Sequence, residues 1–321
     1  MIGHQDRSRT EECGHVRWTR TIRAGALLAV AALGLTACGG GGSDQPAAQS
    51  KGGAPIVVAS FNFTDSQILA ELYAGALEAK GYPVTRKLNL GSRELIYPSL
   101  KKGELQFVPE YQGAAIATGF GKDAVKDAAG EHSQLAELFK PEGIGLLNYA
   151  PAEDKDVYIV KADLAKSKGL STIGDLKKLD KVVMAGGPEC ETRLPCFKGF
   201  QDVYKLTNAT FKTVQEIGPR VQELDSGGAT VIPVDSVSPV AGDSKYVVLK
   251  DDLGIEPTEN VVPAVSQKVL DERGADFAAA VNAVSAKLTT DELRDLNSRV
   301  DSDGEPAADV AKDWLKQQGL A

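Results

Sequence analysis

Residues 56–81 have the sequence IVVASFNFTDSQILAELYAGALEAKG, and this stretch decides the fold. The apolar residues 56–59 predict a short buried strand. Residues 66–80 predict a helix that ends at Gly81, because their apolar side chains recur on one helical face: Ile68, Leu69, Leu72, Tyr73, Ala76 and Leu77. A strand followed by an amphipathic helix indicates an α/β protein.

The same alternation continues along the chain. Strand-like segments at 84–88 and 105–108 flank a helix through residues 95–100, while residues 266–318 predict consecutive helices, one of which begins at Thr289. Further strands are predicted at residues 157–160, 181–184, 229–232 and 246–249. Alternating strands and helices predict β-α-β units in a mostly parallel sheet.

The composition excludes one broad class of function. The chain has 321 residues, with 36 Lys and Arg against 44 Asp and Glu, a formal net charge of −8, and 42% hydrophobic residues. An acidic chain lacks the basic surface that phosphate-backbone binding needs, so we expect no nucleic-acid partner. The apolar content suffices for a folded core, and the length suggests about two domains of roughly 150 residues each.

The sequence gives enzyme chemistry little support. The histidines are His4, His15 and His132, and the first two lie within residues 1–37, which are expected to be cleaved off as a signal peptide. The remaining chain therefore cannot form a multi-histidine zinc site, and a histidine-based triad would have to use His132. Residues 119–123 have the glycines and lysine of a phosphate loop, but Asp123 stands where a metal-binding hydroxyl belongs. We therefore expect no enzyme activity, no cofactor and no metal.

Residues 1–37 have the features of a signal peptide. Three arginines within residues 17–23 precede an uncharged apolar run at 24–35, which is too short to span a bilayer and is typical of a secretory signal. The run ends in LTAC at residues 35–38, which resembles a bacterial lipobox, whose cysteine becomes the lipidated first residue. The alternative is an ordinary signal peptide followed by an incidental cysteine.

Cleavage before Cys38 would leave a lipidated flexible tether, residues 38–53, rich in glycine and alanine. We therefore expect the mature protein outside the cytoplasm, anchored by lipid to the outer face of the bacterial cell membrane. In that oxidising location Cys190 and Cys196 are predicted to form a disulfide. A metal site there is disfavoured, because no further thiol and no nearby histidine would complete it.

Several stretches resemble the glycine betaine/carnitine/choline-binding proteins of osmoprotectant ABC importers. They are IVVASFNFTD at 56–65, KLNLGS at 87–92, GELQFVPEYQG at 103–113, GPE at 187–189 with Arg193, LKDDLG at 249–254 and LTTDEL at 288–293. The resemblance covers essentially the whole mature chain and is looser between residues 199 and 243.

The resemblance implies a type II periplasmic-binding-protein fold, in which two α/β domains joined by two crossovers enclose a ligand cleft. Domain one would comprise residues 54–156 plus 264–321, and domain two residues 157–263. The implied function is the extracytoplasmic solute-binding component of an ABC importer. It captures a quaternary-ammonium or related cationic osmoprotectant by hinge closure and delivers it to a membrane permease, and we expect it to act as a monomer.

The resemblance also implies a set of ligand-binding residues. Tyr111 and Tyr158 match two tyrosines that surround the quaternary ammonium group in the family, and Arg193 matches an arginine that binds a ligand carboxylate. Gln112 lies in the same motif as Tyr111 and belongs to the expected site. The alternative is that both tyrosines are core residues with satisfied hydroxyl groups and that Arg193 forms a surface ion pair.

The expected site departs from the family at other positions. Phe61 stands where the family often has a lysine, Ala114 where it has a threonine, and Asp235 and Glu259 where two further tyrosines are expected. A half-aromatic, half-acidic site favours a cation, including one with N–H groups. The alternative is that Asp235 and Glu259 lie in solvated loops and do not face the ligand. Phe63 and Tyr149 are equally consistent with a role in core packing and with a position in the lining of the cleft.

A second class of function also fits this altered site. A site with fewer tyrosines could bind a neutral or aromatic small molecule, or a partner protein, and act as a receptor without transport. An extracytoplasmic enzyme is a third possibility, and turnover of a hydrolysable substrate would reveal it.

The lipid anchor is testable by replacing Cys38 with alanine. Because the thiol forms the thioether to the lipid, Cys38→Ala should release the protein from the membrane fraction or leave the signal peptide uncleaved. Fractionation and immunoblotting measure both outcomes, and Cys13→Ala, within the signal peptide, is the control. Unchanged processing and membrane retention of Cys38→Ala would contradict the lipobox.

Overall fold

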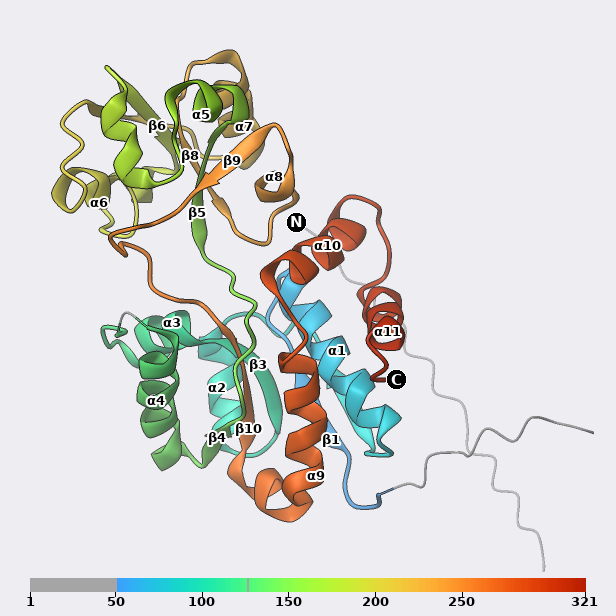
Figure 1. The fold of residues 1–321 in the computed structure, drawn as a ribbon. Coiled ribbons are helices and arrows are strands. Elements are labelled where there is room, and N and C mark those ends of the chain that lie inside the picture. Colours follow the sequence, from blue (N-terminus) through green and yellow to red (C-terminus); the bar gives the residue numbers. More distant parts are fainter. Residues whose placement is uncertain (1–50, 126) are drawn as a thin grey trace, which may run out of the picture. The chain divides into compact units, whose positions relative to one another are not determined.

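The computed structural model describes residues 51–125 and 127–321. The expected signal peptide, residues 1–37, the expected lipidated Cys38 and most of the tether lie outside the described residues. Between residues 51 and 321 the chain forms two lobes, each built around its own β-structure (Figure 1). The first lobe has a five-stranded sheet in the order β2-β1-β3-β10-β4, and the second has a three-stranded sheet, β8-β5-β9, beside the strand pair β6-β7.

The first lobe is assembled from the two ends of the described chain. Its strands are β1 (Ile56–Ala59), β2 (Val84–Lys87), β3 (Phe107–Tyr111), β4 (Ile144–Leu146) and β10 (Val261–Ser266). Its helices are α1 (Thr64–Ala79), α2 (Arg93–Lys101), α3 (Gln112–Ala114), η1 (Ala115–Gly119), α4 (Ala128–Phe139), η2 (Lys140–Glu142), α9 (Gln267–Ser285), α10 (Thr290–Asp301) and α11 (Ala307–Gln317).

The second lobe is formed by the middle of the chain. Its strands are β5 (Asp156–Lys161), β6 (Val182–Gly186), β7 (Ala209–Thr213), β8 (Ile232–Asp235) and β9 (Tyr246–Leu249). Its helices are α5 (Ala162–Lys168), η3 (Ile173–Lys178), η4 (Pro188–Glu191), α6 (Phe197–Asp202), α7 (Ile217–Ser226) and α8 (Pro239–Gly242). An isolated bridge between Met184 and Val231 connects β6 with the segment that precedes β8.

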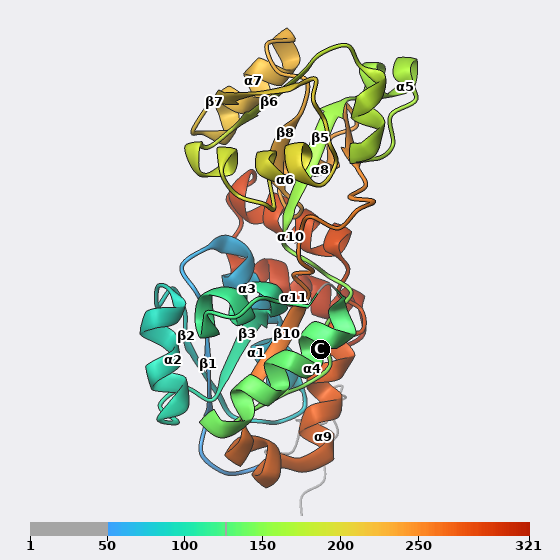
Figure 2. The ribbon, with the colours of Figure 1, turned by 90° about the vertical axis from the view of Figure 1, so that its left-hand side faces the viewer.

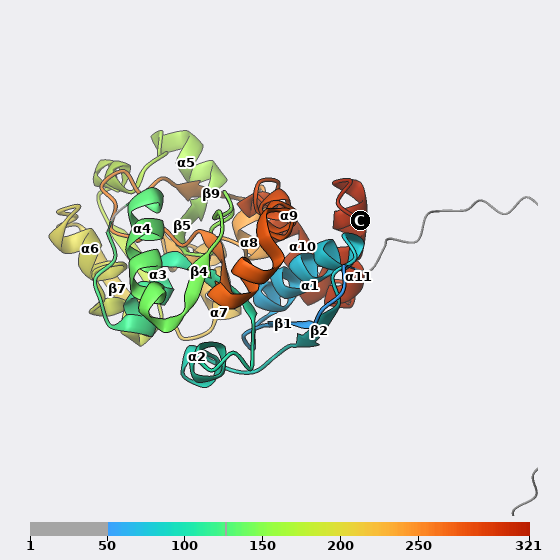
Figure 3. The ribbon, with the colours of Figure 1, turned by 90° about the horizontal axis from the view of Figure 1, so that it is seen from below.

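Both faces of the five-stranded sheet are buried. Along β3, Phe107 packs against the cluster that contains α1, α9, α10 and α11, while Val108 packs on the opposite face with α2 and α4. Val261 and Val262 of β10 alternate in the same way. Strands covered on both faces are apolar at successive positions, which is why IVVA at 56–59 indicates a buried strand. The close packing of α1 with α9 and α11 is visible from below in Figure 3.

Strand β10 is a central strand that the sequence analysis does not predict. It pairs antiparallel with β3, so that Pro263 lies opposite Pro109, and its other edge pairs with β4. Proline lacks the N–H that a ladder needs and normally argues against a central strand. The Pro263 carbonyl still accepts a hydrogen bond, from the backbone N–H of Leu147 at 3.1 Å.

The chain passes between the lobes in two places, as Figure 2 shows from the side. One connection follows β4 and leads into β5, and the other follows β9 and leads into β10. They meet at an antiparallel bridge between Glu153 and Asn260. The expected domain boundary at residues 263 and 264 falls inside β10, whose six residues lie in the sheet of the first lobe.

Helix α10 of the first lobe also contacts the second lobe through hydrogen bonds to residues that follow β8. The Nε group of Arg294, in α10, donates to the carbonyl of Ser236, just after β8, at 2.9 Å.

The side chain of Thr289 caps α10 by accepting a hydrogen bond from the backbone N–H of Glu292 at 3.2 Å, as its sequence predicts. The strand predicted at residues 229–232 corresponds to β8, which begins only at Ile232.

Among the described residues, no helix combines the length and the apolar character that a membrane span requires.

Candidate functional site

A cavity of about 330 Å³ is lined by residues of both lobes and of the two connections. We call it the acidic cavity. The first lobe contributes Phe63, Arg93, Tyr111 and Ala114, and the second contributes Asp156, Arg193, Pro195 and Asp235. The connections contribute Asp154, Lys155, Glu256, Pro257 and Glu259.

The first-lobe wall is aromatic. The rings of Phe61 and Phe63 are stacked, with centroids 5.7 Å apart, and the Phe63 ring lies 6.0 Å from the Tyr111 ring. Phe63 is 40% exposed, whereas Tyr111 is 4% exposed and its hydroxyl donates to Asp65. The guanidinium of Arg93 lies 5.0 Å from the centroid of Phe61. An aromatic wall of this kind attracts cations and accommodates alkyl groups.

Arg93 is held by a buried carboxylate. Its Nη2 atom donates to Oε2 of Glu110 at 2.8 Å, and Tyr97 donates its hydroxyl to Oε1 of the same carboxylate at 2.7 Å. Burial is the largest single effect and lowers the pKa of Arg93, but the attraction and the hydrogen bond of Glu110, together with smaller contributions from Tyr97 and Glu259, outweigh it, and the pKa is raised. Arg93 is therefore a fixed cation whose charge is largely balanced by Glu110.

The second-lobe wall carries two acids on neighbouring strands. Asp156 at the start of β5 lies directly opposite Asp235 at the end of β8. Like charges in this position repel each other. Burial raises the pKa of Asp156 to about 6, with repulsion from Asp235 adding to the shift. Burial also raises the pKa of Asp235, and the nearby Arg220 partly opposes that rise.

The connections add three more acids. Burial raises the pKa of Glu256 to about 8, although its Oε1 atom accepts a hydrogen bond from the Tyr158 hydroxyl at 2.6 Å. Burial likewise raises the pKa of Glu259 to about 8, and its Oε2 atom accepts from the backbone N–H of Ala114 at 2.8 Å. The pKa of Asp154 is raised by burial and then by repulsion from neighbouring acids.

The basic residues of the acidic cavity do not balance these acids. Arg93 is paired with Glu110, and the Nζ group of Lys155 is paired with Glu153. Arg193 has no ion pair within residues 51–125 and 127–321 and remains as the available cation. Five lining carboxyl groups therefore face one unpaired arginine. Crowded carboxylates that outnumber the cations around them favour a bound cation.

Arg193 follows a disulfide-closed turn. Cys190 and Cys196 are disulfide-bonded, with Cα atoms 5.2 Å apart, in agreement with the sequence prediction. Both cysteines are buried in the core of the second lobe. Pro195, between Arg193 and Cys196, also lines the acidic cavity. The bridge thus closes the short segment from which Arg193 reaches the cavity.

The structure brings together most of the expected site residues. Tyr111, Ala114, Arg193, Asp235 and Glu259 line the acidic cavity, while their ligand contacts remain predictions. The remaining three lie behind its wall.

Phe61, Gln112 and Tyr158 are each 1% exposed or less. Phe61 lies beneath Phe63, Gln112 donates from Nε2 to the carbonyl of Ala128, and Tyr158 reaches the cavity only through Glu256. These three residues support the wall.

Sequence reasoning missed several lining residues. Asp154, Asp156 and Glu256 lie in polar segments that resemble solvated loops, and no local pattern marks them. Arg93 had one available signal, since it is a basic residue that closely follows the KLNLGS motif. Phe63 was predicted to pack or to line the cleft, and the structure places it at the cavity.

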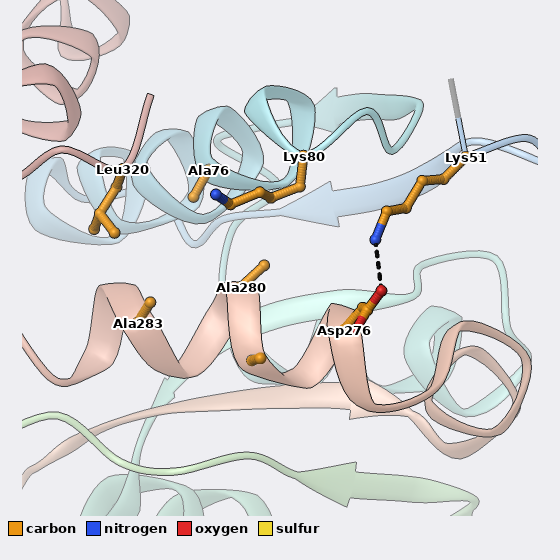
Figure 4. Close-up of a pocket in the computed structure, with 8 residues that line it drawn as sticks. Lys51, Ala76, Lys80, Asp276, Ala280, Ala283 and Leu320 are labelled. Atoms are coloured by element: carbon orange, nitrogen blue, oxygen red, sulfur yellow. Dashed lines mark hydrogen bonds and ion pairs between the residues drawn. The ribbon is translucent and has the colours of Figure 1, made fainter. Parts of the chain in front are cut away.

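Metal binding finds no support in the described residues, where no three His, Cys, Asp or Glu side chains gather as metal ligands do. A second cavity, of about 360 Å³, lies between α1 and α9 in the first lobe (Figure 4). Alanines, among them Ala76, Ala280 and Ala283, form much of its wall, and Lys51 pairs with Asp276 at its edge, 3.0 Å apart. Unlike the acidic cavity, this second cavity has no convergent polar groups from both lobes.

Known proteins resemble this chain over most of its length. Residues 54–317 match the substrate-binding domain of ABC-type glycine betaine transport systems. The glycine betaine-binding protein YehZ of Escherichia coli is 27% identical over 282 residues, which cover 83% of this chain and 91% of that protein. The carnitine transport binding protein OpuCC of Listeria monocytogenes is 23% identical over 304 residues, covering 91% and 94% of the two chains.

The structural comparison shows the same fold. The apo structure of YehZ from Escherichia coli superposes with a TM-score of 0.73 at 23% identity, covering 84% of this chain and all of that one. The type II periplasmic-binding-protein fold implied by the sequence resemblance is thereby confirmed. Because the match to the substrate-binding domain spans most of the sequence, this chain belongs to the family of substrate-binding domains of ABC-type glycine betaine transport systems.

Proposed function

We propose that this protein captures a small organic cation outside the cell and presents it to an ABC permease in the membrane. The single observation that carries the proposal is the charge balance of the acidic cavity. Five carboxyl groups line it, and Arg193 is the one lining cation without an ion pair in the described chain. Such a cavity attracts cations and disfavours free carboxylates.

The aromatic wall supports a quaternary-ammonium or related ligand. Phe63 and Tyr111 present ring faces or edges to the cavity from the first lobe. Each ring beside a desolvated cation contributes about 1–2 kcal/mol to binding. Asp235 and Glu259 take the positions where the family resemblance implies two more aromatic rings, so charge attraction replaces part of the cation–π energy.

The capture mechanism follows from where the ligand contacts lie. The lining residues come from both lobes, and the chain connects the lobes by two extended segments. A ligand that contacts both walls favours the arrangement in which the lobes are close together. In our proposal the permease recognises that closed arrangement, and a lipid on Cys38 keeps the protein at the outer face of the membrane.

A calorimetric panel tests the ligand class. We expect the full chain to bind choline more tightly than glycine betaine or carnitine, because a ligand carboxylate is repelled by the lining acids. The expected difference is at least about tenfold, which corresponds to 1.4 kcal/mol. Asp235→Ala and Glu259→Ala should each weaken choline binding by about tenfold.

Asp163→Ala, at an exposed position in α5, is the matched control for these two variants. Polyamines complete the panel as cations with N–H groups. Tight glycine betaine binding that neither Asp235→Ala nor Glu259→Ala alters would contradict the proposed ligand class.

The affinity for choline should depend on pH. Choline carries a fixed charge, so any pH dependence arises from the protein. The pKa values of Asp156, about 6, and of Glu256 and Glu259, about 8, imply that these groups are largely neutral at pH 5 and ionise as the pH rises. Ionised carboxylates attract the cation, so choline affinity should rise by at least about tenfold from pH 5.5 to pH 8.5.

The same linkage predicts that choline binding releases protons between these pH values. Titrations at pH 7 in buffers of different ionisation enthalpy measure the number of protons released. An affinity that is independent of pH, with no proton release, would show that these carboxyl groups do not face the bound cation.

A further inference from the structure

Among the acids that line the acidic cavity in the described chain, Asp154 alone has a buried carboxylate oxygen without a hydrogen-bond partner. Its Oδ1 atom is buried and has no hydrogen-bond partner among the described residues. Glu256 and Glu259, by comparison, accept hydrogen bonds from Tyr158 and Ala114. A buried carboxylate oxygen that lacks a donor carries an uncompensated loss of hydration. Because Asp154 lines the acidic cavity, a ligand that brings an N–H to its carboxyl group as the lobes rearrange around the ligand would compensate this loss.

The backbone fixes the position of Asp154. Its own N–H donates to the carbonyl of Glu259 at 3.1 Å. The preceding N–H, of Glu153, donates to Oγ1 of Thr290 at 3.0 Å, and the following N–H, of Lys155, donates to Oγ of Ser236 at 3.1 Å. These bonds hold the segment to the first lobe, to the second lobe and to the other connection, so its carboxyl group is preorganised.

The surroundings of Asp154 contain acids and one phenol. Asp65 of α1, Asp235 of β8, Glu259 and Asp156 of β5 all repel its negative charge, and Tyr111 of β3 lies close enough to interact with it. Lys155, its sequence neighbour, is paired with Glu153 instead. A positive charge brought by the ligand is therefore the natural partner of Asp154.

The aromatic wall favours a different feature of the ligand, namely methyl groups on its cationic nitrogen. Tyr111 and Phe63 line the same cavity and suit the methyl groups of a substituted ammonium ion. A fully methylated nitrogen can satisfy these rings, but it has no N–H to donate to Oδ1 of Asp154, and its C–H groups form only weak contacts with oxygen. An ammonium ion with methyl groups and at least one N–H can satisfy both walls.

We propose that Asp154 determines specificity for the ligand's cationic group and favours an ammonium ion that carries an N–H over a fully methylated one. The inference rests on the proposed function, because it assumes that a small cation binds in the acidic cavity. It narrows the class of ligand to protonated tertiary or less substituted amines with alkyl groups on the side of the aromatic wall.

The test compares two cations that differ in one substituent on nitrogen. N,N-dimethylethanolamine, protonated at pH 7, has an N–H where choline has a third methyl group. In calorimetry with the full chain at pH 7, we expect dimethylethanolamine to bind at least tenfold more tightly than choline. In Asp154→Ala the ratio should fall to about one, because dimethylethanolamine loses its acceptor and choline loses no hydrogen bond.

Asp163→Ala should keep the wild-type ratio, since Asp163 is exposed in α5. Asp154→Ala removes an unpartnered buried carboxyl group, so its urea-unfolding midpoint should be equal to or above that of the wild type. The ratio of the dimethylethanolamine and choline affinities in the wild type tests the inference even if Asp154→Ala does not fold. Asp154→Glu, which restores the acceptor, should recover part of the ratio.

The outcomes separate this inference from the function on which it rests. Equal affinities of the wild type for the two cations, or an unchanged ratio in Asp154→Ala, would overturn the role of Asp154 and leave cation capture intact. Loss of both cations in Asp154→Ala would also overturn it, because Asp154 would then be a general charge contact. Failure of the wild type to bind either cation would overturn the proposed function together with the inference.

Discussion

Repulsion between the crowded carboxyl groups of the acidic cavity is the constraint on which this site depends. Asp156 and Asp235 lie opposite each other on neighbouring strands, and Asp154 and Glu259 face the same cavity. Burial and mutual repulsion disfavour their ionisation, whereas a bound cation would favour it. The ligand-free protein thus holds a site that is destabilised until a positive charge enters, and cation affinity and proton release become linked quantities.

The fold places these groups together by bringing distant segments to one point. In the second lobe β5 begins and β8 ends at the cavity, and the two connections that carry Asp154 and Glu259 meet at the bridge between Glu153 and Asn260. The first lobe supplies the aromatic wall, in which the Tyr111 hydroxyl donates a hydrogen bond to Asp65. Each wall is backed by its own hydrophobic core, so the two chemistries, ring faces and carboxylates, are positioned independently.

The sequence predicts the parts that local patterns determine. Apolar runs such as residues 56–59 mark buried strands, and the cap at Thr289 marks the start of α10. β10 was missed because Pro263 argues against a central strand, and the structure places it opposite another proline. Tyr158 was predicted in the site from its motif, yet it lies behind Glu256, because only the fold determines which side chain forms the surface. Asp154 carries no local signal, since its role comes from the contact between two connections distant in sequence.

The central claim is that charge, more than shape, determines what this cavity binds. Choline and 3,3-dimethylbutan-1-ol test it directly, because the second replaces the nitrogen of the first by carbon and is nearly identical in shape but uncharged. Calorimetry of the full chain at pH 8 should give choline an affinity at least about a hundredfold higher, which corresponds to roughly 2.7 kcal/mol. Equal affinities for the two molecules would contradict the account, because they would show that the cavity recognises shape and apolar surface alone.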